Sequence, residues 1–144
     1  MGVPGEGSKS SDQIKPEGAG DPLDLTAARV AELAAEGVRL IDVRTSHEHE
    51  AGRLAGSDRI GLEELTDRRD EIGPREKVVF YCRNGSRSHM AAEAFAGAGY
   101  DAHNLEGGIV GWLEEGRPVM PEDGYAAEPG EAAAALEAQA RNNA

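Results

Sequence analysis

The sequence predicts an α/β protein with three layers, α/β/α, built around a central, mostly parallel sheet of five strands. Largely apolar runs such as residues 38–43 and 77–81 alternate along the chain with segments of helical pattern. Continuous apolar strands of this kind are typical of parallel sheets that are covered by helices on both faces. The length of 144 residues supports one such domain and little more.

A helix separates the first two expected strands. A short apolar piece at residues 23–25 precedes a helix at 26–36, which Thr26 can cap and in which apolar side chains share one face. Gly37 ends this helix, because glycine readily adopts the left-handed conformation that follows a helix. Residues 38–43 then form a buried strand.

The next region carries weaker signals. Ser46 can cap a short helical turn over residues 46–51. A weak strand is expected near residues 59–61, and a helix over residues 62–69. Gly73-Pro74 then breaks the chain.

The strongest strand covers residues 77–81, which are continuous, β-branched and aromatic. A helix at 86–98, a short strand at 101–105 and a last helix at 108–115 complete the pattern. Sites in parallel sheets of this kind lie at the carboxyl ends of the strands. Cys82 stands there, directly after the strongest strand and just before a helix.

Charge and cysteine content limit the function classes. The chain has 27 acidic and 15 basic residues, for a formal net charge of −12. An acidic surface repels phosphate groups, so we expect neither a nucleic-acid nor a membrane partner. Cys82 is the one cysteine, which excludes an intrachain disulfide and a zinc site of several thiolates. We expect no bound metal.

Composition divides the chain into three parts. We expect a disordered leader at residues 1–21, the folded domain at 22–120 and an acidic, Ala-rich tail at 121–144. The leader lacks the apolar run of a signal peptide, and no stretch approaches the ~20 apolar residues of a membrane span. A cytoplasmic location is therefore expected.

The segment after the strongest strand favours a cysteine thiolate. It reads Cys82-Arg83-Asn84-Gly85-Ser86-Arg87-Ser88. A tight loop that leads into a helix places several backbone N–H groups and the positive end of the helix dipole near the sulfur. The two arginines add full positive charges. Because the thiolate is the nucleophilic form, the pattern predicts a nucleophile in an anion-binding loop. The alternative is a cysteine that only packs in the core.

Four motifs, in order, resemble those of rhodanese domains. Ile41-Asp42-Val43-Arg44 looks like their D-V-R strand end, and Gly52-Arg53-Leu54-Ala55-Gly56 is similar to their G-H-I-P-G turn. Residues 82–88 resemble their active-site loop, and residues 105–112 match their L-x-G-G-x-x-x-W. The resemblance covers about residues 22–120. Arg53, Ala55 and Asp58 depart from the family pattern before the third strand, not at the active-site loop.

The resemblance implies sulfur transfer without a metal or organic cofactor. Cys82 would attack the outer sulfur of a small anionic donor such as thiosulfate and become a persulfide. A thiophilic acceptor, which could be cyanide, a thiol or a protein, would then take the sulfur. The other loop residues would bind the substrate, namely Arg83, Asn84, Gly85, Ser86, Arg87 and Ser88. The residues expected to support the loops are Asp42, Arg44 and Glu48.

Two other functions remain as alternatives. Rhodanese-like phosphatases and arsenate reductases carry five residues between the cysteine and the arginine, whereas four separate Cys82 from Arg87. The shorter loop argues for sulfur, because a tetrahedral phosphate needs a wider ring of donors. The other alternative is a persulfide carrier or redox-sensing module that serves a protein partner.

The side chains around the loop have expected roles as well. Arg83 should point to the mouth of the site, and Arg87 should be held by a carboxylate such as Glu48 or Asp42. His47 and His49 make a weak metal pair, because a spacing of two does not align them on one face of a helix, and they are expected to be exposed to solvent instead.

Overall fold

The computed structural model describes residues 20–129 and contains one sheet of five parallel strands. The strand order is β1-β5-β4-β2-β3, with β4 at the centre. The strands are β1 (Asp24–Leu25), β2 (Arg39–Asp42), β3 (Asp58–Arg59), β4 (Val78–Tyr81) and β5 (Ala102–Leu105). The α-helices are α2 (Ala27–Ala35), α3 (Ser46–Ala51), α4 (Ser86–Gly97) and α5 (Gly108–Glu114). The predicted α/β class and the five-stranded sheet are confirmed.

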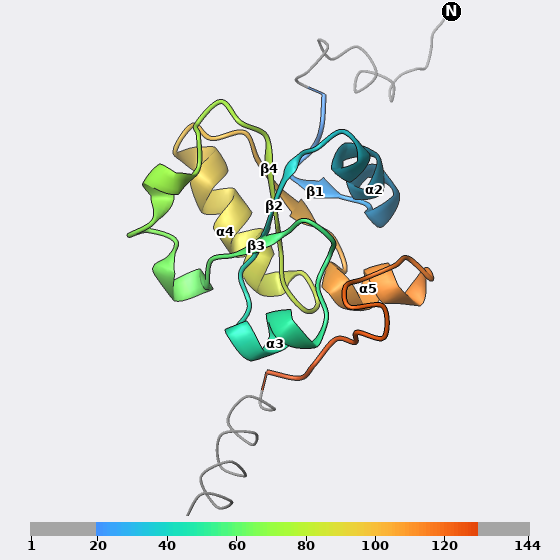
Figure 1. The fold of residues 1–144 in the computed structure, drawn as a ribbon. Coiled ribbons are helices and arrows are strands. Elements are labelled where there is room, and N and C mark those ends of the chain that lie inside the picture. Colours follow the sequence, from blue (N-terminus) through green and yellow to red (C-terminus); the bar gives the residue numbers. More distant parts are fainter. Residues whose placement is uncertain (1–19, 130–144) are drawn as a thin grey trace, which may run out of the picture.

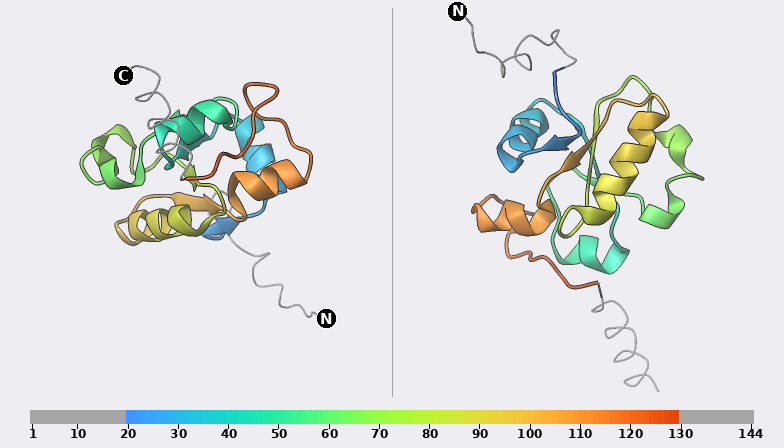
Figure 2. Two further views of the ribbon diagram at one scale, coloured as in Figure 1. Left: turned by 90° about the horizontal axis from the view of Figure 1, so that it is seen from below. Right: turned by 180° about the vertical axis from the view of Figure 1, so that it is seen from behind.

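Helices cover both faces of the sheet, which gives the three predicted layers. Figure 1 shows α4 on one side of the strands and α2 and α5 on the other, and the view from behind in Figure 2 shows the same division. Side chains of β4 alternate between the two faces, so Val79 and Tyr81 pack with α2 and α5 while Val78 and Phe80 pack toward α4. All four are fully buried. This is why the segment reads as continuously apolar.

Two local expectations were wrong. The helix expected over residues 62–69 is replaced by two short 3-10 helices, Leu62–Glu64 and Arg69–Glu71. The N-cap of α3 is Thr45 and not Ser46. The Thr45 hydroxyl accepts a hydrogen bond from the Glu48 backbone N–H, and the Glu48 carboxylate accepts one from the Thr45 N–H in return. Such a reciprocal pair satisfies two donors that the start of a helix otherwise leaves open.

The carboxyl ends of the strands meet at one edge of the sheet, where α3 and the loop after β4 also lie (Figure 1). Asp42, at the end of β2, pairs in register with Tyr81 at the end of β4. Cys82 therefore begins the loop beside the polar end of β2.

Both ends of the described chain contact the domain. Asp21 forms ion pairs with Arg29 at 2.9 Å and with Lys77 at 2.6 Å. Residues 121–129 return along α3, and Ala127 is fully buried. The boundaries expected at residues 21 and 120 stay predictions, since most of the expected leader and tail lies outside the described residues.

Candidate active site

The Cys82 sulfur is buried and is surrounded by hydrogen-bond donors. The Gly85 backbone N–H lies 3.1 Å from Sγ, the Ser88 N–H lies 3.5 Å away and the Ser88 hydroxyl 3.3 Å. These donors come from the loop and the first turn of α4, which begins at Ser86. Gly85 has φ +98°, a conformation that side-chain-bearing residues rarely adopt, and this turn brings its N–H to the sulfur.

These donors favour the thiolate. Burial has the largest influence on the ionisation of Cys82 and opposes it. The hydrogen bonds from Ser88 and Gly85 and the positive charge of Arg87 together outweigh burial, so the pKa of the Cys82 thiol is held below its ordinary value. A cysteine that only fills space in the core has no such set of donors.

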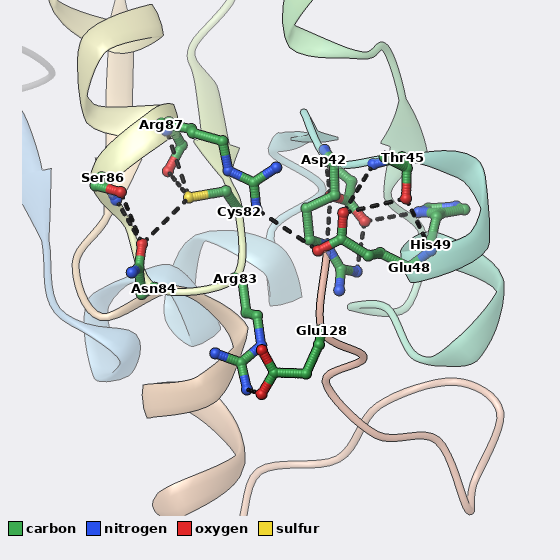
Figure 3. Close-up of polar contacts among 12 residues, drawn as sticks. Asp42, Thr45, Glu48, His49, Cys82, Arg83, Asn84, Ser86, Arg87 and Glu128 are labelled. Carbon is green, nitrogen blue, oxygen red and sulfur yellow. Dashed lines mark hydrogen bonds and ion pairs between the residues drawn. The ribbon is translucent and has the colours of Figure 1, made fainter. Parts of the chain in front are cut away.

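The side chains of Asn84 and Ser86 bond to each other and stabilise the turn after Cys82. The Asn84 side-chain oxygen accepts hydrogen bonds from the Ser86 N–H at 3.0 Å and the Ser86 hydroxyl at 2.9 Å (Figure 3). That oxygen lies 4.0 Å from Cys82 Sγ. Both side chains are exposed. Their predicted contacts with substrate therefore remain predictions.

Arg87 is held by Glu48, as the sequence predicts. One guanidinium nitrogen of Arg87 lies 3.5 Å from Glu48 Oε2, and Glu48 is fully buried in α3 (Figure 3). The other Glu48 oxygen accepts the capping bonds of Thr45. A buried carboxylate thus draws the Arg87 side chain from α4 toward α3.

Arg83 also has a carboxylate partner, which sequence reasoning missed. Its guanidinium lies 2.9 Å from Glu128 Oε2, 45 residues further along the chain (Figure 3). The pair keeps contact with solvent, since the side chains are 28% and 63% exposed. The missed partner lies in a segment whose composition resembles a tail, so no local pattern indicates it.

A buried ion pair stands at the end of β2. Arg44 donates two side-chain hydrogen bonds to Asp42, at 2.7 and 2.6 Å, and both side chains are fully buried. His49 Nδ1 lies 2.9 Å from the same carboxylate, so the expectation of an exposed His49 was wrong. Burial opposes the charge of Asp42, but the hydrogen bonds from His49 and Arg44 outweigh it and hold the pKa of this carboxyl below its usual range. Arg44 also donates to the Gly52 carbonyl, so the pair connects the end of β2 to the end of α3, and its support of the loop at Cys82 stays a prediction.

A family model and known relatives agree with this arrangement. The model of the Rhodanese-like domain matches residues 26–115, which is more than half of the chain. The chain belongs to the rhodanese-like family. A sulfurtransferase of Allochromatium vinosum is 34% identical over 90 residues, which cover 62% of this chain and 84% of that protein. A rhodanese-related protein of Thermoplasma volcanium has a similar structure, with a TM-score of 0.65, 31% identity, and coverage of 69% of this chain and 98% of that one.

Some relatives are longer than this rhodanese-like chain. A putative sulfur carrier protein of Bacillus subtilis is 30% identical over 78 residues, which cover 54% of this chain but 42% of that protein.

Within residues 20–129, no group of three or more His, Cys, Asp or Glu side chains is placed to hold a metal ion. The same residues include no helix long and apolar enough to cross a membrane.

Residues at the start of α5 hold the loop that carries Cys82 in place. At the start of α5 the Ile109 N–H donates to the Cys82 carbonyl and the Val110 N–H to the Arg83 carbonyl, each at 3.0 Å. This approach needs Gly108, because a Cβ there would lie 2.4 Å from the Arg83 carbonyl oxygen. The Gly107-Gly108 pair in the sequence was the signal for this contact, although its spacing alone does not reveal the partner.

A chain of hydrogen bonds also extends from the sulfur toward the surface. The Ser88 hydroxyl lies 2.6 Å from Asn104 Oδ1, and the Asn104 amide donates to Asp24 at 2.9 Å. Asp24 in turn contacts His89 Nδ1 at 2.8 Å. The carboxylate can only accept, so it fixes the Asn104 amide with its oxygen toward Ser88. The Ser88 hydroxyl has one hydrogen, so it can donate either to Asn104 Oδ1 or to Cys82 Sγ at 3.3 Å, and the full negative charge of a thiolate favours donation to the sulfur.

We expect replacement of Ser88 by alanine to raise the pKa of Cys82. The change removes the hydroxyl donor at 3.3 Å from Sγ, which favours the thiolate over the thiol. The measurement is the rate of iodoacetamide alkylation against pH, whose inflection follows the thiolate fraction. Since a higher pKa leaves less thiolate at neutral pH, Ser88→Ala should be alkylated more slowly there. Ser86→Ala also removes a serine hydroxyl, but one that donates to Asn84, and it should leave the pH of the inflection unchanged. Equal inflections in Ser88→Ala and wild type would contradict this role.

Proposed function

We propose that this protein is a sulfurtransferase that moves a sulfane sulfur from a donor such as thiosulfate to a thiophilic acceptor through a Cys82 persulfide. The observation that carries the proposal is the set of three donors around Sγ, with Gly85 N–H at 3.1 Å. They stabilise negative charge on sulfur before the reaction begins, which is how preorganised donors lower a barrier. Family membership and the A. vinosum sulfurtransferase support the same reaction class.

The proposed reaction has two displacements. The Cys82 thiolate attacks the outer sulfur of thiosulfate, an S–S bond forms, and sulfite leaves with the electron pair of the broken S–S bond. Cyanide or another acceptor then attacks the terminal sulfur of the persulfide. The S–S bond to Cys82 breaks, thiocyanate leaves when cyanide is the acceptor, and the thiolate is regenerated. The N–H groups of residues 83–88 would surround the terminal sulfur between the two steps.

The direct test is the intact mass of the protein after incubation with thiosulfate. We expect a gain of one sulfur atom that disappears when cyanide is added, with thiocyanate released in equal amount. Pretreatment with iodoacetamide, which blocks the sulfur, should prevent the gain. A wild-type protein that gains no sulfur and makes no thiocyanate would overturn the proposal.

The same purified protein also tests the two alternative functions. A persulfide that forms but is discharged only by a protein thiol would identify a carrier, as the name of the B. subtilis relative suggests for that protein. Phosphatase activity is disfavoured, because four residues separate Cys82 from Arg87 and because Arg87 is drawn to Glu48. A phosphoryl dianion binds best to a guanidinium that offers both of its forked donors, and one side of the Arg87 fork faces Glu48. Hydrolysis of an aryl phosphate faster than thiocyanate formation would favour the phosphatase.

The cytoplasmic location stays a prediction.

A further inference from the structure

The segment after α5 is anchored beside the loop that carries Cys82. Arg53 and Met120 exchange two backbone hydrogen bonds, at 2.9 and 2.8 Å, and the Tyr125 N–H donates to the Ala51 carbonyl at 3.0 Å. Figure 1 shows this red segment running along α3. Its approach to the end of α3 is so close that a Cβ at Gly52 would lie 2.4 Å from the Tyr125 carbonyl oxygen. The path of the segment is thus fixed by backbone contacts.

This anchoring places Glu128 at the arginine next to the nucleophile. Ala127 is fully buried, so the backbone just before Glu128 is held against the domain. Glu128 then reaches Arg83 at 2.9 Å (Figure 3). Among residues 20–129 the buried Nε of Arg83 has no hydrogen-bond partner, so Glu128 does not complete the hydrogen bonding of the guanidinium.

The two arginines of the loop differ in how exposed their carboxylate partners are. The partner of Arg87 is the fully buried Glu48, which also caps α3 and cannot leave without opening that helix start. The partner of Arg83 is 63% exposed. A carboxylate in that position has water as an alternative partner, and an incoming anion can compete with it for the guanidinium.

We propose that Glu128 is a specificity-determining residue that neutralises Arg83 and so disfavours doubly charged sulfur donors relative to singly charged ones. The proposal deepens the function proposed above and rests on it in so far as Cys82 receives the donor. A dianion drawn toward Arg83, the residue next to Cys82, meets the carboxylate of Glu128 there, in a protein whose net charge is already −12. A donor with less charge meets less of this repulsion.

The first test measures access of anions to Cys82 without assuming sulfur transfer. Iodoacetate carries a negative charge and iodoacetamide carries none, while both alkylate the same thiolate. Both reagents need the same exposure of the buried sulfur, so the ratio of their rates isolates the effect of charge. We expect Glu128→Gln to raise the iodoacetate-to-iodoacetamide ratio about 3- to 10-fold at low salt, the scale of one partly screened charge. The gain should shrink at about 1 M salt, where the Debye length is about 3 Å.

Two further variants control this measurement. Glu36→Gln removes the same charge from an exposed position at the end of α2, at the opposite edge of the sheet, and should leave the ratio unchanged. In an Arg83→Gln background the effect of Glu128→Gln should fall well below its effect in the wild-type background, because the pair is already broken. A ratio in Glu128→Gln no higher than in Glu36→Gln would overturn the proposal.

Steady-state kinetics then connect the charge effect to donors. Thiosulfate is a dianion, and a thiosulfonate, RSO2S−, presents the same kind of outer sulfur with one charge. For Glu128→Gln we expect the KM for thiosulfate to fall about 3- to 10-fold, with a smaller change for the thiosulfonate and little change in kcat. Equal changes in KM for both donors would overturn the specificity role. If neither donor is turned over while the alkylation ratio still shifts, the sulfurtransferase function fails and the charge effect of Glu128 stands.

Discussion

Replacement of Cys82 by serine is expected to lower thiocyanate formation from thiosulfate and cyanide by at least about 1,000-fold, the scale seen when a nucleophile is removed. A serine hydroxyl is not ionised near neutral pH, and no residue among those described as contacting Sγ is a general base that could activate it. The intact mass of Cys82→Ser after thiosulfate treatment should equal that of the untreated variant.

The Cys82→Ser variant reports on the reaction only if it still folds. The hydroxyl is smaller than the thiol and can accept the same donors from Gly85 and Ser88, so urea unfolding of Cys82→Ser should remain cooperative. Wild-type protein alkylated at the sulfur gives an independent comparison, since its sequence is unchanged. A folded Cys82→Ser protein that keeps more than about a tenth of the wild-type rate would remove Cys82 from the mechanism.

Replacement of Asp42 by asparagine is expected to lower the free energy of unfolding by about 3–5 kcal/mol, the usual cost of leaving a buried charge without its partner. Asp42 and Arg44 are both fully buried, and their two side-chain hydrogen bonds measure 2.7 and 2.6 Å. Asparagine has nearly the same shape but no charge to balance the guanidinium. The measurement is urea unfolding at neutral pH.

Two variants sharpen this result. Asp58→Asn makes the same change at a carboxylate that is 60% exposed and bonded to Arg39, and it should cost less than about 1 kcal/mol. The double variant Asp42→Leu with Arg44→Met removes both charges and should be more stable than Asp42→Asn. An Asp42→Asn protein as stable as Asp58→Asn would show that the buried pair does not hold this end of the sheet.

The effect of Asp42 also depends on pH. Its folded-state pKa lies below the unfolded value, so the stability that it contributes is present above the unfolded pKa, about 3.9. That contribution is lost as the pH falls through the folded-state pKa. The difference in unfolding free energy between wild type and Asp42→Asn should therefore be full at neutral pH and shrink under strongly acidic conditions.

Local patterns predicted most of the fold and the centre of the site. The four-residue strand before Cys82 is buried on both faces, so its apolar run identified β4 as the strongest strand. Cys82, Gly85 and Ser88 are close in sequence, and the same short turn that the sequence indicates brings them together in space. The partner of Arg87 could be predicted because few carboxylates lie near the carboxyl ends of the strands.

The parts that could not be predicted depend on distant segments. Glu128 is 45 residues from Arg83 and belongs to an acidic, Ala-rich stretch in which its charge looks like ordinary solvated charge. His49 was expected to be exposed, but its ring contacts Asp42, a carboxylate at the end of another element that no local pattern around His49 indicates. Residues 62–69 have helix-forming composition, yet the Leu62 N–H donates to the Val43 carbonyl and Leu65 is buried, and these tertiary contacts override local propensity.

The loop at Cys82 is not a transferable module. A graft of residues 82–88 onto another strand and helix would carry the cysteine and the amides that face it. It would leave behind the α5 amides that hold the carbonyls of Cys82 and Arg83, and the carboxylates that engage its arginines. The grafted peptide would present two uncompensated guanidinium groups on an unsupported turn. An engineer who wants this nucleophile in a new scaffold must therefore transplant α3, α5 and the segment up to Glu128 along with the heptapeptide.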